Sequence, residues 1–305
     1  MASLSASLLR GALSSPLKRA GRPDAALPPD RRTRPAAPVA PGPLAAYAGI
    51  CGFPETGTLP LTYPHVLAFP DTLRLMTGRA FPLPVLGLVH TWIEITPHRP
   101  VRPEEPLELT VYAEKLSPHR RGSEVTMATE ARVAGELVWA SRSGYLSRHA
   151  TSRPVTDPVT DPAADPAADP AADRPAGPSP AAAERPAPAG PAPEELPARA
   201  EWTLPGDLGR RYGAVSGDRN PIHLHPLTAK PFGFPRAIAH GMWTAARCLA
   251  EAADPVGIRT VRVEFRAPVL LPAAVTYAAD ASGRAFALRG PGGRVHLVGS
   301  VARKA

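Results

Sequence analysis

The sequence predicts an α+β protein in which one fold occurs twice, each copy being a long helix covered by an antiparallel sheet. Residues 99–114, RPVRPEEPLELTVYAE, parallel residues 267–280, APVLLPAAVTYAAD, since each has a Pro-Val pair, a second proline and a Thr/Val/Tyr strand. Residues 47–53, YAGICGF, likewise parallel residues 212–218, YGAVSGD. The same order, a helix followed by strands, also recurs on both sides of a proline-rich segment. These observations indicate an internal duplication.

The first copy is expected at residues 33–150. Residues 67–78, LAFPDTLRLMTG, are its helix candidate. The segments that follow are rich in β-branched and aromatic residues or alternate in polarity, which predicts strands joined by hairpin-like breaks. The expected strands are residues 86–95, 107–116, 122–133 and 136–147.

The second copy is expected at residues 199–305 and repeats this order. Residues 239–252, AHGMWTAARCLAEA, predict a helix. In the strand TVRVEFRAPV, Val261, Val263 and Phe265 share one face, because side chains alternate along a strand. A Gly-Gly turn is expected at Gly292 and Gly293. The expected strands are residues 260–269, 273–282, 284–290 and 294–303.

The segment between the copies, residues 151–198, is predicted to be an extended, semi-rigid linker. The tetrapeptide Asp-Pro-Ala-Ala repeats there in tandem. Proline removes backbone donors and blocks helix propagation, and almost no large apolar side chain is available to bury. Residues 1–32 are expected to be a flexible lead. Their start is rich in Ser, Leu and Arg with no acid before Asp24, a composition that a mitochondrial transit peptide can have, but a short bacterial lead-in helix is the preferred interpretation.

The composition excludes several classes of protein. No apolar run approaches the roughly 20 residues that a membrane-spanning helix needs, so no membrane span is expected. The net charge of +8 is scattered rather than gathered on a basic face with interleaved aromatics, which argues against a nucleic-acid partner. Cys51 and Cys248 are the only cysteines and cannot build a disulfide framework. A reducing, cytoplasmic setting fits this cysteine content best.

The stretch YGAVSGDRNPIHLHP, residues 212–226, is the main candidate for a chemical site. The carboxylate of Asp218 and the imidazole of His223 can hold one water between them, and the imidazole can take a proton from it. Asn220 could cap the turn or hold His223 in one tautomer. The structural alternative is an Asx-type turn in which Asp218 caps the backbone and His223 only packs. Spacing alone favours neither interpretation.

The first copy keeps the frame of this turn but lacks the ionisable pair. Phe53 stands where the second copy has Asp218, and Thr58 stands where it has His223. A loss in one copy alone suggests that the second copy holds an active site and that the first has been converted to another use.

Residues 212–250, YGAVSGDRNPIHLHPLTAKPFGFPRAIAHGMWTAARCLA, resemble the signature of the MaoC-like dehydratases, the (R)-specific enoyl-CoA hydratases of the hot-dog fold. The resemblance rests on a Gly-Asp-x-Asn-Pro-Ile-His turn and a Phe-x-x-Ala-Ile-Ala-His-Gly-Met helix entrance. It implies two tandem hot-dog domains that form an intrachain pseudo-dimer. The first copy resembles the degenerate amino-terminal hot dog of two-domain members, with TYPHVLAFP, residues 62–70, standing where the second has RAIAHGMWT, residues 236–244.

The resemblance further implies a reaction, the reversible hydration of trans-2-enoyl thioesters to (R)-3-hydroxyacyl thioesters. By the motif match, His223 is the general base on the water and Asp218 is its partner and acid. Asn220 supports the site. The backbone N–H of Gly241 is the oxyanion donor, which agrees with the positive end of a helix dipole stabilising an enolate.

Neighbouring residues carry expectations of their own. The position two after the catalytic His is often Asp in this family and is His225 here, which is expected to alter the local charge without removing the water site. The His-Leu-His sequence could suggest a metal, but no third ligand is evident nearby, so neither a metal nor a cofactor is expected. His240 is expected to be structural, and Cys248 has no adjacent base that would make it a nucleophile.

The expected partner is an acyl-CoA thioester, and a homodimer of double hot-dog chains is a further expectation. Three alternatives stay open on the sequence. They are the same reaction on acyl groups bound to a carrier protein, as in lipid or polyketide synthesis, a hot-dog thioesterase, and a non-catalytic module that binds acyl thioesters. The Asp-x-Asn-Pro-Ile-His turn argues against the thioesterase.

Overall fold

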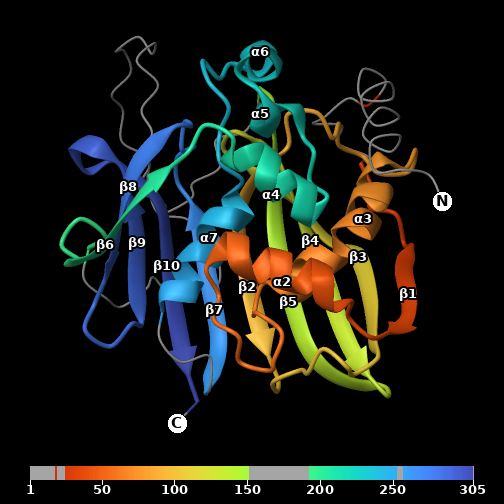
Figure 1. The fold of residues 1–305 in the computed structure, drawn as a ribbon. Helices are drawn as coiled ribbons and strands as arrows, with labels where there is room; N and C mark the ends of the chain where they lie inside the picture. The colour runs from red at the N-terminus through yellow and green to blue at the C-terminus, as the bar shows by residue number, and fades with distance from the viewer. Residues whose placement is uncertain (1–17, 19–24, 151–191, 253–256, 305) are drawn as a thin grey trace, which may run out of the picture.

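The computed structural model describes residues 18, 25–150, 192–252 and 257–304. Its ten strands form one continuous antiparallel sheet in the order β1-β3-β4-β5-β2-β7-β10-β9-β8-β6, and the longer helices lie against one face of this sheet (Figure 1). Most of the predicted linker and of the predicted lead lies outside the described residues. Within them, no helix has the length and apolar character to cross a membrane.

The two halves of the sheet have the same connectivity. In the amino-terminal half the strand order is β1-β3-β4-β5-β2, and in the carboxy-terminal half the corresponding order is β6-β8-β9-β10-β7. The halves therefore meet through equivalent strands, β2 and β7, and form an intrachain pseudo-dimer, as predicted. The amino-terminal elements are β1 (Arg31–Ala37), α2 (Pro41–Cys51), α3 (Tyr63–Thr77), β2 (Val89–Pro97), β3 (Leu107–His119), β4 (Gly122–Val133) and β5 (Glu136–Arg148). The carboxy-terminal elements are β6 (Ala198–Leu204), α4 (Leu208–Ser216), α5 (Pro221–Leu224), α6 (Pro226–Ala229), α7 (Gly241–Glu251), β7 (Ile258–Phe265), β8 (Ala273–Ala279), β9 (Ala285–Arg289) and β10 (Val295–Arg303).

Strands β2 and β7 join the halves. They pair antiparallel, with Ile93 opposite Val263 and Ile95 opposite Val261. All four side chains are buried in one hydrophobic core that includes residues of both halves. Trp243 of α7 also donates from Nε1 to the carbonyl oxygen of Ile50 in α2, at 2.9 Å. Strand pairing, a shared hydrophobic core and a side-chain hydrogen bond thus all join the two halves.

The predicted helices and strands are all present, but the predicted order is incomplete. Each half begins with a strand and a short helix, β1 and α2 or β6 and α4, that the sequence patterns did not indicate. Strand β1 is almost wholly exposed, so it carries no alternation of apolar and polar residues. Helix α2 begins Pro-Gly-Pro, and proline is compatible with the first turn of a helix although it breaks a helix interior. Because β1 begins at Arg31 and β6 at Ala198, the folded units start slightly earlier than expected.

Candidate active site

Helix α4 sets the position of Asp218. The helix ends at Ser216, and Gly217 caps it in the left-handed conformation with φ 77°. The first half has the same ending, in which Gly52 caps α2 with φ 79°. The chain then folds back over α4 so tightly that a Cβ at Gly213 would lie 2.7 Å from the carbonyl oxygen of Asp218. A glycine is therefore required where the loop carrying Asp218 crosses the helix.

The turn that follows contains the predicted Asx-type turn. Asp218 Oδ1 accepts a hydrogen bond from the backbone N–H of Asn220 at 3.1 Å. The side chain of Asn220 caps α5 by accepting from the N–H of Ile222 at 3.4 Å. Asn220 therefore caps the turn, the first of the two roles considered for it. Its carbonyl oxygen accepts from the backbone N–H of His223 at 3.0 Å, but among the described contacts its side chain makes no hydrogen bond to the His223 ring, whose Nδ1 bonds Ile238 instead. The backbone bond uses one carboxylate oxygen of Asp218, whose side chain stays 27% exposed.

His223 is buried and held by one backbone hydrogen bond. Its Nδ1 lies 2.8 Å from the carbonyl oxygen of Ile238. Since a carbonyl can only accept, Nδ1 carries the proton and Nε2 of the neutral ring keeps a lone pair. Burial lowers the pKa of His223, while the nearby charge of Asp218 raises it by a smaller amount. The ring is therefore neutral at pH 7 and able to accept a proton at Nε2.

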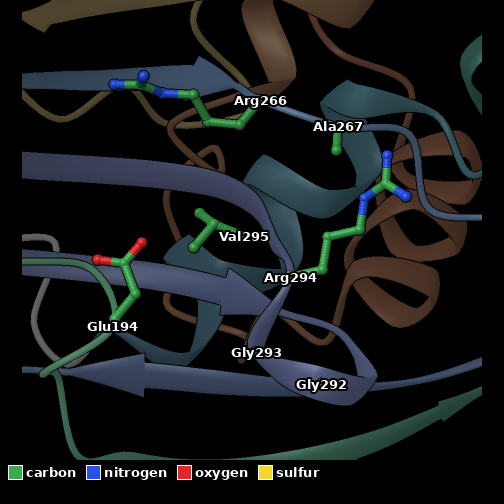
Figure 2. Close-up of a pocket in the computed structure, with 7 residues that line it drawn as sticks. All are labelled: Glu194, Arg266, Ala267, Gly292, Gly293, Arg294 and Val295. Atoms are coloured by element: carbon green, nitrogen blue, oxygen red, sulfur yellow. The ribbon is translucent and has the colours of Figure 1, made fainter. Parts of the chain in front are cut away.

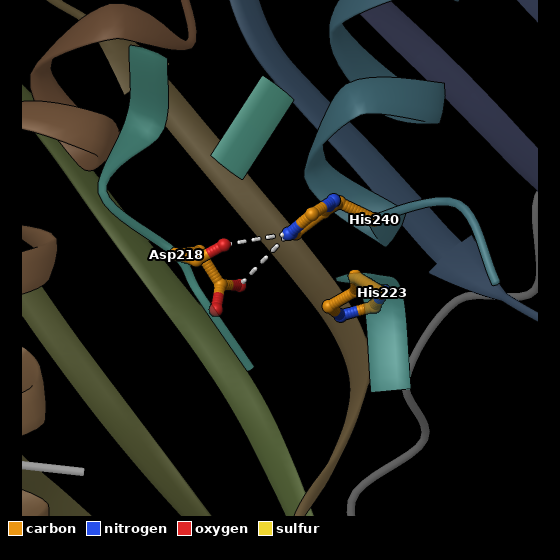
Figure 3. A group of neighbouring side chains, drawn as sticks. All are labelled: Asp218, His223 and His240. Carbon is orange, nitrogen blue, oxygen red and sulfur yellow. Dashed lines mark hydrogen bonds and ion pairs between the residues drawn. The ribbon is translucent and has the colours of Figure 1, made fainter. Parts of the chain in front are cut away.

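His240, expected to be only structural, lies against both of these residues (Figure 3). Its ring stacks on His223 with centroids 3.7 Å apart, and its Nε2 lies 2.9 Å from the carbonyl oxygen of Asp218 and 3.8 Å from Asp218 Oδ2. Burial, and then the neighbouring His223, hold the pKa of His240 well below its usual value. His240 is thus a neutral donor that fixes the backbone of Asp218.

Gly241 is the first residue of α7 and follows His240 directly. Among the described residues no group accepts a hydrogen bond from its backbone N–H, as is usual for the first turn of a helix. A Cβ at this position would lie 3.1 Å from the ring of Phe265, so the aromatic ring closes one side of the amide. The position suits the predicted oxyanion donor.

The prediction that no further potential metal ligand lies near the His-Leu-His sequence is wrong. Asp218, His223 and His240 each bring one such atom within 4.8 Å of the others. The donor set does not favour a metal, because His240 Nε2 donates to a carbonyl oxygen and so has no lone pair to offer. The spacing suits water, since two hydrogen bonds of about 2.8 Å that meet at a water oxygen join atoms about 4.6 Å apart. His225, the other candidate ligand, is exposed and caps α6 instead.

The sequence reasoning missed residues from the amino-terminal half that approach this cluster. His65 of α3 and Tyr145 of β5 are buried, and the charge of Asp218 acts on the pKa of each. His90 of β2 stacks on Tyr145 with ring centroids 4.6 Å apart. A signal was available, because the alignment of TYPHVLAFP with RAIAHGMWT places His65 one position from His240.

The position equivalent to this site in the amino-terminal half has become an apolar cavity of about 140 Å³. Phe53 and Thr58 both line it, together with Leu249, Ile258 and Val301 from the other half. Phe53 and Thr58 cannot act as acid or base, so this position lacks the acid–base pair of the second half. It still borders a cavity that is lined by both halves.

A second cavity, of about 220 Å³, opens at the far turn of the carboxy-terminal half (Figure 2). Arg294 and Glu194 stand on opposite sides of it, and the Gly292–Gly293 turn forms its floor. Both glycines have positive φ, as the predicted Gly-Gly turn requires. None of the predicted site residues lines this cavity, so it does not belong to the Asp218 site.

The fold and the cluster define a double hot-dog protein whose carboxy-terminal half brings Asp218, His223 and His240 together. Residues 190–287 match the family described as MaoC like domain. The chain is 38% identical over 249 residues to 3-hydroxyacyl-thioester dehydratase X of Mycobacterium tuberculosis, an alignment that covers 81% of this chain and 79% of the relative. The chain therefore belongs to the MaoC-like dehydratase family.

Three further similarities agree with this assignment. The crystal structure of HtdX of Mycobacterium tuberculosis superimposes with a TM-score of 0.70 at 32% identity, covering 90% of this chain and 100% of that one. Peroxisomal enoyl-CoA hydratase 2 of Arabidopsis thaliana is 38% identical over 58 residues, which are 17% of this chain and 18% of the relative. A MaoC-like dehydratase of Phytophthora capsici shares the fold, with a TM-score of 0.66 at 18% identity over 93% of this chain and 98% of that one.

Proposed function

We propose that the chain is a hydro-lyase that interconverts trans-2-enoyl and (R)-3-hydroxyacyl thioesters, with acyl-CoA as its substrate. The observation that carries the proposal is the hydrogen bond between His223 Nδ1 and the carbonyl of Ile238, which leaves Nε2 as a base on a ring that is grouped with the Asp218 carboxylate. The relatives named 3-hydroxyacyl-thioester dehydratase and enoyl-CoA hydratase support the same chemistry.

The steps follow from the positions of the groups. Water bound between Asp218 and His223 gives a proton to His223 Nε2 as its oxygen bonds to C3 of the enoyl thioester. The electron pair of the C2–C3 double bond moves towards the thioester carbonyl, whose developing charge is stabilised by the N–H of Gly241 at the start of α7. The proton then passes from His223 Nε2 to the Asp218 carboxylate and from there to C2, so that H and OH add across the double bond and both catalytic groups return to their starting states.

The remaining assignments belong to the same proposal. Residues 33–150 form the non-catalytic hot dog that completes the fold and shapes the space for the acyl chain, and residues 199–305 form the catalytic one, with residues 151–198 as the linker. A cytoplasmic setting is supported by Cys51 and Cys248, which are both free and buried. A homodimer of such chains stays a prediction.

The test is the loss of enoyl-thioester absorbance when the purified protein meets trans-2-enoyl-CoA of short and medium chain length. We expect hydration to an (R)-3-hydroxy product, and a decrease of about 10²-fold or more in Asp218→Asn and His223→Ala. Asp207→Asn is the matched control, because this carboxylate precedes α4 and makes no side-chain cap bond. Wild-type turnover in Asp218→Asn would contradict the site.

The outcome also separates the alternatives. Activity on enoyl groups bound to a carrier protein, with none on the CoA thioesters, would move the substrate to that class. Release of free thiol would indicate a thioesterase, and binding without turnover would indicate a binding module.

A further inference from the structure

Three ring side chains of the amino-terminal half form a continuous layer beside the catalytic cluster. His90 of β2 lies between the other two, with ring centroids 4.6 Å from Tyr145 and 6.0 Å from His65, and the planes differ by 13° in both pairs. Phe265 of β7 packs on His90 at 4.9 Å and also borders Gly241. The layer thus extends from the oxyanion donor to the neighbourhood of Asp218.

The layer is close enough to Asp218 for charge to act on it. The negative charge of Asp218 raises the pKa of His65 against the larger, opposite effect of burial, and it adds to burial in raising the pKa of Tyr145. The charge of Asp218 thus reaches both outer rings of the layer, His65 and Tyr145, while His90 between them contacts Phe265, which borders Gly241. A thioester lying from Gly241 to Asp218 would have the two histidines along its flank.

Both histidines have ring nitrogens without protein partners. His65 Nδ1 and His90 Nε2 are buried, and no described residue is within hydrogen-bonding geometry of either atom. Burial lowers the pKa of His65 to about 4 and that of His90 to about 3, so both rings are neutral at pH 7. Buried polar atoms without partners are uncommon in folded proteins and call for a ligand or an ordered water.

The hydrogen-bond donors and acceptors of the two neutral imidazoles determine which chemical group they can bind. A backbone hydrogen bond with Trp92 uses the N–H of His90, so its free Nε2 offers a lone pair, whereas the free Nδ1 of His65 can carry a proton; together the two free atoms can both give and receive a hydrogen bond. A hydroxyl group or a water molecule does the same, whereas a carboxylate only accepts and an ammonium only donates. An alkyl chain would leave both nitrogens unsatisfied at a cost in binding.

We propose that His65 and His90 are substrate-binding residues supplied by the amino-terminal half, and that they hydrogen-bond the C3 hydroxyl of the 3-hydroxyacyl thioester and the water from which it forms. This inference rests on the proposed function, because it assumes that the thioester occupies the Asp218 site. It gives the non-catalytic half a part in selecting hydroxylated over plain acyl groups.

The test uses Asp218→Asn as the parent, so that ligands bind without turnover. Isothermal titration calorimetry measures the Kd of an (R)-3-hydroxyacyl-CoA and of the saturated acyl-CoA of equal chain length. We expect the parent to prefer the hydroxylated ligand, and His65→Phe or His90→Phe to reduce that preference about 3- to 10-fold, since each removes one hydrogen bond and keeps an aromatic ring. His65→Gln, which keeps a donor and an acceptor, should restore most of the preference.

His98→Phe is the matched control, because His98 is an exposed histidine of the same half, and circular dichroism checks that each variant is folded. A preference unchanged in both Phe variants would overturn the inference while leaving the proposed function intact if the wild-type protein hydrates enoyl-CoA. A parent that binds neither thioester would instead contradict the proposed function, and this inference with it.

Discussion

His223 and His240 are stacked neighbours with opposite tautomers. The Ile238 carbonyl takes a hydrogen bond from Nδ1 of His223, and the Asp218 carbonyl takes one from Nε2 of His240. One ring is therefore left with a lone pair at Nε2 and the other with a donor at that atom. The motif predicted which residues meet, but two carbonyl groups from separate loops decide which imidazole is the base, and those positions depend on the fold.

The donor role of His240 can be tested by substituting this single residue. In His240→Phe the stacking on His223 is retained, but the Asp218 carbonyl loses its partner and the loop is less firmly held. We expect kcat to fall about 10-fold with a smaller change in KM, because a hydrogen bond of this kind contributes about 1.4 kcal/mol. Steady-state kinetics on enoyl-CoA measure both constants, and His240→Gln, which keeps a donor, should recover part of kcat. Equal activity in His240→Phe and wild type would show that the residue only packs.

At the scale of elements, the sequence predicted the long helices and the hairpin strands of both halves. These elements have strong local signals, such as the turn at Ala134 and Gly135, where both residues have positive φ. Strand β1 and helix α2 lacked such signals, because an exposed strand need not alternate and helix α2 is proline-rich at its start. Strand β6 does alternate, with Ala200, Trp202 and Leu204 less exposed than the residues between them, so for this strand a signal was present in the sequence. The site was predicted from a motif on one loop. The residues that approach it from α3, β2 and β5 are far away in sequence, and only the pairing of the halves brings them near.

Helices α2 and α4 offer a matched pair of glycine substitutions. In α4, Gly213→Ala would place a Cβ 2.7 Å from the Asp218 carbonyl oxygen, so the loop must move. In α2, Gly49 has no atom within 4 Å of an added Cβ. We expect Gly213→Ala to lower both the free energy of unfolding, by about 1–3 kcal/mol, and the hydration rate. Gly49→Ala should raise stability by up to about 1 kcal/mol, since alanine favours a helix. Urea titrations give both values, and equal effects at the two positions would contradict the role of the close approach.

At the scale of the whole molecule, four histidines gather where the halves meet, His65 and His90 from one half and His223 and His240 from the other. Three of them are buried, and His90 is half-buried with its Nε2 inaccessible to solvent. Burial lowers the pKa of every one of them. The sheet is continuous through β2 and β7 at the same place. Protonation of these histidines at low pH is therefore expected to destabilise the junction between the two halves.

The consequence for pH has a definite sign. Below about pH 6.5 the unfolded chain binds protons at these histidines, while the folded protein does not until about pH 4 at His65 and about pH 3 at His90. The free energy of unfolding should thus fall by several kcal/mol as the pH drops from 6.5 towards 4. Urea unfolding at a series of pH values measures the slope, which should be shallower in His65→Phe. Hydrogen exchange in β4 and in β9 should report one joint transition, and a stability independent of pH over this range would contradict the argument.

Within the part of the chain that the structure describes, no further strand pairs with the outer edges of the ten-stranded sheet, at β1 and at β6. Exposed strand edges invite pairing with further chains, but these two are short and bear charges that oppose it. Strand β1 reads RRTRPAA, with Arg31 over the ring of Tyr112 at 3.8 Å, and its proline removes one backbone donor. Strand β6, at the other edge of the sheet, likewise carries the exposed charged residues Arg199 and Glu201. The duplication thus produces a sheet of fixed length that resists polymerisation, and two such chains that associate in solution are expected to do so through a surface other than their strand edges.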